Sequence, residues 1–375
     1  MTKSTRSSKY AEGVATASAN RVISLFCTVC LGLNSLVMGA QEKAVHDSLD
    51  TLMVSEYIQD HKKQLNIKFE VSNDINTFLV QERDQELTLK PNLNLRYGLV
   101  FSYKFLSVRV GFRPRVSDSD KVNKGESDTY RLRVKLLFDK WSHFLQYDYD
   151  RGFYGANSRD YFPDAGNLKI QFPYLTSNIL YGTSLYKFNP NYSLRSIESQ
   201  TEIQTKSTGS FIMGLSYNFY KLMGSDRVVL PGEELTRRYP NKEYYGVSLA
   251  AIGGYYYTWV FKRNFFLNGY ARPGLGIDMN QTRINTDQSM SNTVHYQSFF
   301  VEMEYGFGAG YNGNRFFFGA NLINRLANEK YGQDDINIQP KKNTFNIYLG
   351  YRFKAPKQVA KPVDLIEEKV PILQR

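Results

Sequence analysis

Apolar and polar residues alternate with a period of two along most of the chain, from about residue 64 onward. Between positions 95 and 103 every odd position is Leu, Tyr or Phe, while Arg96, Gly98 and Ser102 stand between them. Successive side chains of a β-strand point to opposite faces, so the pattern predicts a strand with one apolar and one polar face. The same alternation returns in segments 106–114, 129–139, 208–222, 294–311 and 343–353.

Thirteen segments are strand candidates by this criterion: 65–80, 94–104, 106–114, 129–139, 141–150, 173–188, 192–204, 208–222, 244–261, 264–279, 294–311, 315–328 and 343–353. Bacterial single-chain barrels have an even number of strands. Asp226–Pro231 would add a short strand and give fourteen. If the first or the seventh candidate is not a strand, the count is twelve.

Such strands build either a soluble sandwich, with the apolar faces packed together, or a transmembrane barrel, with those faces toward lipid. Many segments reach ten residues, whereas ordinary globular strands have about 5–6. Short turns (104–105, 139–140, 189–191, 261–264, 312–314) alternate with long polar loops (115–128, 151–170, 281–293, 332–343). We therefore predict an all-β, transmembrane, antiparallel up-and-down β-barrel of 12–14 strands. A secreted soluble β protein is the alternative.

The N-terminal region has the features of a secretory signal peptide. Lys3, Arg6, Lys9 and Arg21 precede an apolar run, Val22–Met38, which ends in Gly39-Ala40. A basic region, an apolar stretch and a small residue at the cleavage site define such a signal, with a single membrane anchor as the alternative. The chain then divides into a signal peptide (1–40), a periplasmic segment (41–64), an outer-membrane barrel (65–353) and a periplasmic tail (354–375).

Composition narrows the classes of partner. The two cysteines, Cys27 and Cys30, lie inside the apolar run, which excludes a disulfide scaffold and a cysteine-ligated zinc site from the rest of the chain. The formal net charge is +11, but an exported protein does not meet nucleic acid. We expect contact with outer-membrane lipid, lipopolysaccharide and the barrel-assembly machinery, and no cofactor. The tail offers a docking segment for a periplasmic protein.

The polar faces predict the lining of the lumen. Arg96, Arg109, Arg113, Arg131, Arg133 and Lys135 come from neighbouring strands and would form a basic wall. Glu198, Glu202, Glu302 and Glu304 come from later strands and would form an acidic wall. One interpretation is a pore with a transverse field that selects small charged or polar solutes. The other is a closed interior in which these charges pair and fill the lumen.

An enzyme within the barrel is the third class of function. A lipid hydrolase needs a serine activated by a histidine. No strand candidate places His and Ser two residues apart on one face, and His46, His61, His143 and His295 show no metal-ligand spacing. We therefore expect that the protein is not an enzyme.

Several stretches also resemble a known family. They are Pro91-Asn92, Leu99–Phe105, Phe138-Asp139, Gly152-Phe153-Tyr154, Tyr161-Phe162-Pro163-Asp164, Gln200–Phe211 and Gly350-Tyr351-Arg352-Phe353. Together they are similar to an uncharacterised, domain-of-unknown-function family of Gram-negative outer-membrane β-barrel proteins, most specifically in the run 200–211. The resemblance implies a barrel in the outer membrane and no particular activity. From the residues themselves we expect a porin-like passive channel. A non-conducting barrel with a structural or assembly role is the alternative.

Overall fold

The computed structural model describes residues 56–82, 85–224, 227–231, 237–238, 241–285, 292–327 and 336–369. The expected signal peptide (1–40), residues 41–55 and the last six residues of the tail lie outside this part of the chain. Within it, no helix combines the length and the apolar content needed to cross a lipid bilayer.

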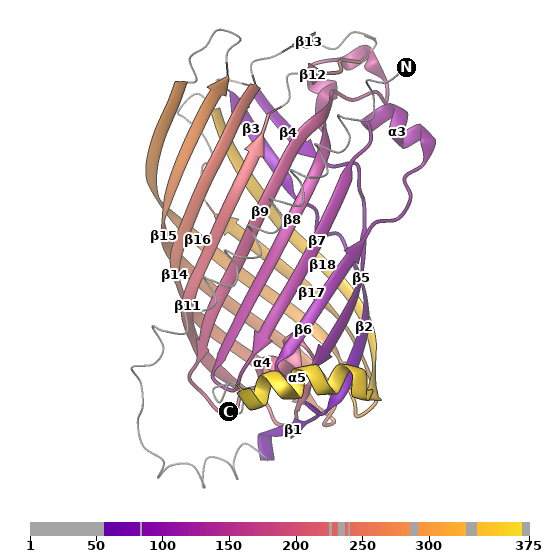
Figure 1. Cartoon of the computed structure of the whole chain (residues 1–375), viewed down its shortest axis with the longest axis vertical. Helices are drawn as coiled ribbons and strands as arrows, with labels where there is room; N and C mark the ends of the chain where they lie inside the picture. Colours follow the sequence, from indigo (N-terminus) through magenta and orange to yellow (C-terminus); the bar gives the residue numbers. More distant parts are fainter. Residues whose placement is uncertain are drawn as a thin grey trace. The chain divides into compact units, whose positions relative to one another are not determined.

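Among the described residues, twelve antiparallel strands close into a barrel (Figure 1), which confirms the predicted fold class. The strands are β2 (Gln64–Ser72), β5 (Arg96–Tyr103), β6 (Leu106–Phe112), β7 (Asp128–Leu137), β8 (Trp141–Gly155), β9 (Gln171–Lys187), β11 (Thr208–Met223), β14 (Asn241–Phe261), β15 (Phe265–Asn285), β16 (Asn292–Asn312), β17 (Phe316–Ala327) and β18 (Ile336–Lys354). The last strand pairs with the first, with Tyr348 opposite Glu70, and this pairing closes the ring.

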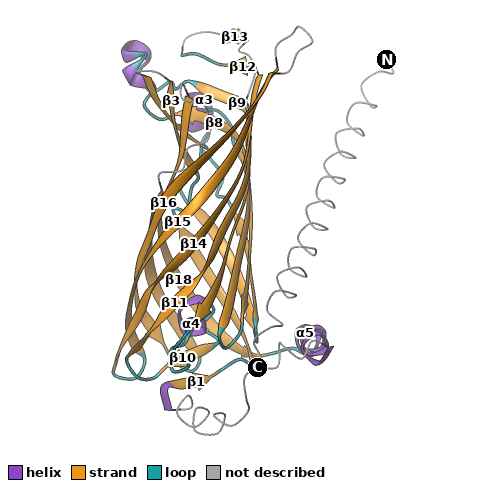
Figure 2. Cartoon of the chain, turned by 90° about the vertical axis from the view of Figure 1, so that its left-hand side faces the viewer, coloured by secondary structure: helices purple, strands orange, loops and turns teal. Residues whose placement is uncertain are grey.

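The two ends of the barrel differ (Figure 2). At one end, here called the short-turn end, turns such as 104–105 and 262–264 join neighbouring strands, and β1 (Ile58–Asp60) and the helix α5 (Lys357–Lys369) lie there. The opposite, long-loop end carries α3 (Asp118–Lys124) and the short helices η1 (Ser158–Asp160) and η2 (Pro163–Ala165).

The proposed extra strand at Asp226–Pro231 is wrong as a barrel strand. Only β12 (Arg227–Val228) forms in it, and this pairs with β13 (Arg237–Arg238) in a separate small sheet. A two-residue pairing is far too short to cross a bilayer, which needs about 9–11 residues in a tilted strand.

Near the long-loop end, a different set of strands completes the ring. There β3 (Thr77–Glu82) pairs with β18, and β4 (Gln85–Lys90) pairs with β8, in place of β2, β5, β6 and β7. The sequence predicts one strand over 65–80, but residues 73–76 interrupt it. That interruption contains Asn73, Asp74 and Asn76, residue types that favour turns.

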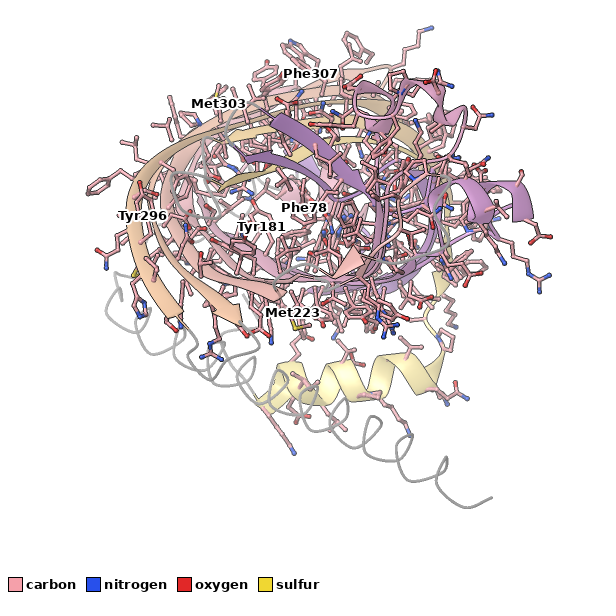
Figure 3. All side chains as sticks on the ribbon, turned by 90° about the horizontal axis from the view of Figure 1, so that it is seen from above. Phe78, Tyr181, Met223, Tyr296, Met303 and Phe307 are labelled. Atoms are coloured by element: carbon pink, nitrogen blue, oxygen red, sulfur yellow. The ribbon has the colours of Figure 1, made fainter. Side chains whose placement is uncertain are left out.

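The apolar side chains of the strands face outward and the polar ones face inward, as the alternation in the sequence predicts. Large apolar side chains such as Phe299 (88% exposed), Leu275 (69%) and Leu349 (59%) point outward. In the view along the barrel, Met303 and Phe307 lie on the outside of the ring, while Phe78 and Tyr181 lie inside it (Figure 3). An exposed apolar belt around a polar interior is the arrangement of an outer-membrane β-barrel.

The predicted strand 192–204 is wrong. A turn does form at 189–191, but it leads into an irregular segment and does not join two barrel strands. Residues 188–207, here called the plug, connect β9 to β11 and hold α4 (Leu194–Glu198) and β10 (Glu202–Gln204). The plug fills the lumen at the short-turn end, where β10 pairs with β1. Tyr192, Gln200 and Thr201 are completely buried, and residues 192–204 have no lipid-exposed face that a strand alternation could serve.

Candidate functional site

Polar side chains of the barrel wall hold the plug through its backbone. The Asn66 amide donates to the Ser199 carbonyl at 3.1 Å, and the Asn312 amide donates to the Glu202 carbonyl at 3.1 Å. The Arg352 guanidinium donates to the Gln200 carbonyl at 2.6 Å. Buried carbonyls need such partners, so these inward-facing side chains provide the backbone hydrogen bonds that the irregular plug cannot make with itself.

Arg195 is the main anchor on the plug side. Its Nε and Nη2 atoms donate to the Leu137 carbonyl of the wall at 2.9 and 2.7 Å. Its Nη1 atom donates to Asp139 at 2.7 Å and to Glu202 at 2.8 Å. Burial alone would raise the pKa of the Glu202 carboxyl, but Arg195 and the Ser193 hydroxyl bring that pKa below its usual range. Partial burial would likewise raise the pKa of the Asp139 carboxyl, but Arg195 has the opposite effect and the pKa is lowered overall.

An apolar contact completes the docking of the plug. Tyr192 and Leu194 pack against Ile212, Ile252 and Phe300, which are inward-facing residues of β11, β14 and β16. The plug is therefore attached to the wall by an apolar patch on one side and by charged and polar groups on the others.

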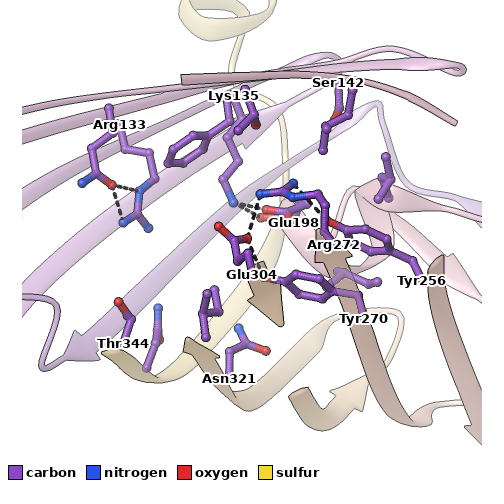
Figure 4. A pocket seen from close by; sticks show the side chains of 18 of the residues that line it. Arg133, Lys135, Ser142, Glu198, Tyr256, Tyr270, Arg272, Glu304, Asn321 and Thr344 are labelled. Carbon is purple, nitrogen blue, oxygen red and sulfur yellow. Dashed lines mark hydrogen bonds and ion pairs between the residues drawn. The ribbon is translucent and has the colours of Figure 1, made fainter. Parts of the chain in front are cut away.

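A chamber of about 170 Å³ lies next to the plug, inside the barrel (Figure 4). Leu194, Ile197 and Glu198 of the plug line it on one side. On the side of the barrel wall, the chamber is lined by Tyr256 and Tyr270, whose stacked rings have centroids 4.4 Å apart. Charged and amide side chains from both walls complete the lining: Lys68, Glu70, Arg133, Lys135, Asn268, Arg272, Glu304, Asn321 and Arg325.

Five of the six residues predicted as a basic wall point into the lumen, and each meets an acid. Arg96 contacts Asp150 at 2.9 Å, Arg109 contacts Glu70 at 2.7 Å and Arg133 contacts Asp74 at 3.0 Å. Arg131 lies between Asp74 and Asp148, and Lys135 pairs with Glu198. Arg113 lies outside this set, because it follows the end of β6 and pairs with Asp128 at an exposed position.

The predicted acidic wall is divided between two places. Glu302 and Glu304 point inward from β16, where Glu302 pairs with Arg325 at 2.6 Å and Glu304 with Arg272 at 2.8 Å. Glu198 and Glu202 belong to the plug and not to a wall strand, which corrects their predicted position. Their assignment to a wall depended on the predicted strand 192–204.

Several residues that face the lumen are absent from the two predicted walls, although the apolar–polar alternation of their strands could have identified them. Lys68, Glu70, Asp148, Asp150 and Arg272 share the inward parity of their strands. Asp74 gave no such signal, because it lies in the interruption between β2 and β3. These residues place acids on the basic side and arginines on the acidic side. The two walls are therefore mixed in charge, and opposite charges neutralise one another locally.

An apolar side-chain cluster lies inside the barrel, on the long-loop side of the charged groups. Phe78, Leu89, Phe153, Leu175 and Tyr220 belong to one buried cluster contributed by β3, β4, β8, β9 and β11. Phe78 and Phe153 meet edge to face, with centroids 5.8 Å apart. These side chains are buried against one another, so the cluster fills this part of the interior.

Comparison with solved structures finds outer-membrane barrels at low identity. The outer membrane protease OmpT from Escherichia coli is 8% identical, covering 79% of this chain and 98% of OmpT, with a TM-score of 0.39. The translocator domain of the autotransporter NalP from Neisseria meningitidis is 12% identical, covering 90% of this chain and 99% of that domain, with a TM-score of 0.34. The β domain of the Bordetella autotransporter BrkA is also 12% identical, covering 77% and 98%, with a TM-score of 0.34.

Comparison with curated proteins finds no match. In the described part of the chain, no group of three or more His, Cys, Asp or Glu side chains is arranged to hold a metal ion. Residues 47–353, most of the chain, match a family known only as a domain of unknown function. The chain therefore belongs to the family described as Domain of unknown function (DUF4421).

Proposed function

We propose that the protein is a gated passage for small polar or charged solutes, closed by its plug in the state described above. This refines the porin-like channel expected from the sequence. The barrel strands would form the conduit, the chamber would be its wet interior, and the plug would block the short-turn end. We also propose that the barrel resides in the outer membrane with its long loops outside, since short periplasmic turns and longer outer loops are the usual layout.

The main observation in favour of this proposal is that the chamber lies directly beside the plug. Burying charges is costly even when they are paired, and an apolar filling of similar volume is often neutral or more stable. If the interior side chains served only to fill the barrel, apolar residues would do so at a lower cost than the charged residues Glu304, Arg272 and Lys135, which surround the chamber. Polar walls beside a removable obstruction are what passage of a hydrated solute requires.

Replacing the plug tests the proposal. Phe188 and Phe211 already bond across the end of the β9–β11 pair, and the same register places Asn189 opposite Ser210. Residues 190–209 can therefore be replaced by a two-residue Asn-Gly turn. In planar bilayers we expect the wild-type barrel to be almost silent and the replacement to give stable openings. A variant shortened at the α3 loop is the control and should stay silent. A folded, heat-modifiable replacement variant that never conducts would overturn the proposal.

Ion selectivity gives a second test. The replacement removes Glu198, the partner of Lys135, and leaves that ammonium facing the conduit. Openings should therefore prefer anions in a salt gradient. Adding Lys135→Glu should reduce or reverse the preference, whereas Arg113→Glu, at an exposed position outside the chamber, should leave it unchanged. Equal selectivity in the two charge variants would argue against conduction through the chamber.

A non-conducting barrel with a structural or assembly role is the second candidate. The observation in its favour is the pairing of Arg96, Arg109, Arg131 and Arg133 with acids inside the lumen. Such networks also stiffen a barrel without any transport. The two candidates separate in the plug replacement, because a structural barrel would remain silent or would lose its fold.

We further propose that the barrel is not an enzyme. His143 Nδ1 and Ser184 Oγ lie 2.9 Å apart on the outward face, across strands and therefore invisible to a search within one strand. The His143 ring packs beside Trp141 and Phe138, and Ser184 is only 5% exposed. Both features suit a polar pair satisfied against lipid. Lipid turnover that is lost in His143→Ala would contradict this.

A further inference from the structure

The C-terminal helix α5 is attached to the outside of the barrel wall. Val363 is buried in a cluster with Leu65, Tyr103 and Phe105 of the short-turn end. Lys104, in the turn after β5, pairs with Asp364 at 2.6 Å and with Glu367. Residues 357–369 of the predicted periplasmic tail therefore form a helix docked on the rim of the barrel.

The axis of α5 runs across the barrel axis. Figure 1 shows the helix lying crosswise below the middle of the strands, with its C-terminal end at the left, and Figure 2 shows it end-on beside the wall. From above it lies alongside the ring (Figure 3). In a membrane that the barrel spans, a helix in this position lies parallel to the membrane plane.

The residues of α5 divide into faces around the helix. Val359, Pro362, Val363 and Ile366 follow the i, i+3, i+4, i+7 spacing of one apolar stripe. Val359 and Ile366 remain exposed, at 36% and 50%. At 100° per residue, the charged residues Lys357, Lys361 and Glu368 fall on the opposite side.

The barrel contacts orient these faces. Asp364 and Glu367, which meet Lys104, lie between the stripe and the charged side. The helix is right-handed and runs from right to left in front of the wall in Figure 1. This winding turns Val359 and Ile366 toward the lipid-facing belt of the strands and turns the charged side away from it, toward the water at the short-turn end.

We propose that α5 is an interfacial helix, seated in the lipid leaflet at the short-turn end of the barrel. Its stripe continues the lipid-facing surface, to which Phe353, at the end of β18, already belongs at 44% exposure. With Asp364 and Glu367 held by Lys104, the remaining charges are Lys357, Lys361 and Lys369 against Glu368. That positive excess suits anionic phospholipid headgroups. The partner is thus the membrane itself.

Spin labels on the full chain test the seating. In a Cys27→Ser, Cys30→Ser background, a label is placed at Ile366→Cys or, as the matched control on the charged side, at Glu368→Cys. The protein is reconstituted in vesicles of phosphatidylethanolamine and phosphatidylglycerol. Collision rates are then measured with oxygen, which concentrates in lipid, and with a water-soluble nickel chelate. We expect position 366 to collide with oxygen and to lose collisions with nickel, and position 368 to show the reverse.

Two results would overturn the proposal. Free collision of position 366 with the nickel chelate would place the stripe in water. Protection of position 366 from both reagents would mean that protein covers it. Folding is checked for both variants by heat modifiability. If Ile366→Cys fails this check it is replaced by Val359→Cys on the same stripe, and if Glu368→Cys fails it is replaced by Lys361→Cys on the charged side. The outcome is independent of whether the barrel conducts.

Discussion

Replacing Arg195 by methionine is the sharpest single-residue test of how the plug is held. The change keeps much of the length of the side chain and removes the guanidinium that joins the plug to the wall. Two of its nitrogens donate to the Leu137 carbonyl, and a third reaches Asp139. The variant therefore loses wall contacts without altering any residue of the barrel strands.

The expected effect follows from those contacts. A hydrogen bond to a charged group contributes about 1.5–3 kcal/mol, and the two bonds to one carbonyl are counted once. The Asp139 side chain is 57% exposed, so its ion pair adds at most about 1 kcal/mol. The docked plug should lose about 3 kcal/mol, which lowers the ratio of docked to released plug by roughly 100-fold.

Open probability in planar bilayers is the direct assay. Arg195→Met should open roughly 100-fold more often than the wild type while the open state is still a minor one. Arg159→Met, which changes an exposed loop arginine at the other end, is the control. If the plug replacement conducts but Arg195→Met opens no more often than the wild type, the anchoring role of Arg195 is refuted.

Four further outcomes are expected. Glu198, Glu202 and Asp139 have lowered pKa values when the plug is docked. Their ionised carboxylates therefore stabilise docking above the ordinary carboxyl pKa of about 4, and this stabilisation is lost as the pH falls below it. Openings should accordingly increase below about pH 4. Arg131→Met should destabilise the barrel by about 3–5 kcal/mol in detergent unfolding, because it leaves buried carboxylates without their main cation. Phe78→Ala should cost about 3–5 kcal/mol in the same assay, because this ring is 2% exposed within the buried apolar cluster. Lys104→Met should make α5 more sensitive to proteases and leave the barrel resistant.

The barrel itself was largely predictable from the sequence. Period-two alternation gave the outward and inward parity of strands such as β5, β16 and β18, because lipid on one side and water on the other act on every residue of a wall strand. The pattern failed at 192–204 for the same reason. That segment lies inside the barrel and has no lipid-facing side, so its apolar and polar residues follow local contacts with Asn312 or Arg352 instead of a period.

The candidate site was predictable only in part. Parity identified the arginines of β5–β7, but whether a lumen charge is free or paired depends on which strands meet across the interior. Asp74 reaches Arg131 and Arg133 only because residues 73–76 turn inward. Glu198 reaches Lys135 only because the plug folds back into the barrel. Contacts between distant parts of the chain carry no signature within one sequence.

The accessibility of the chamber tests the central claim most directly. Asn268 lines the chamber and is 6% exposed. In the cysteine-free background, Asn268→Cys is treated with a small charged thiol reagent in reconstituted vesicles, with the plug present or replaced. A plug-gated chamber predicts slow modification with the plug and much faster modification without it. Equally rapid modification in both proteins would show that the plug closes nothing, and slow modification of both folded barrels would show that the lumen stays closed without it.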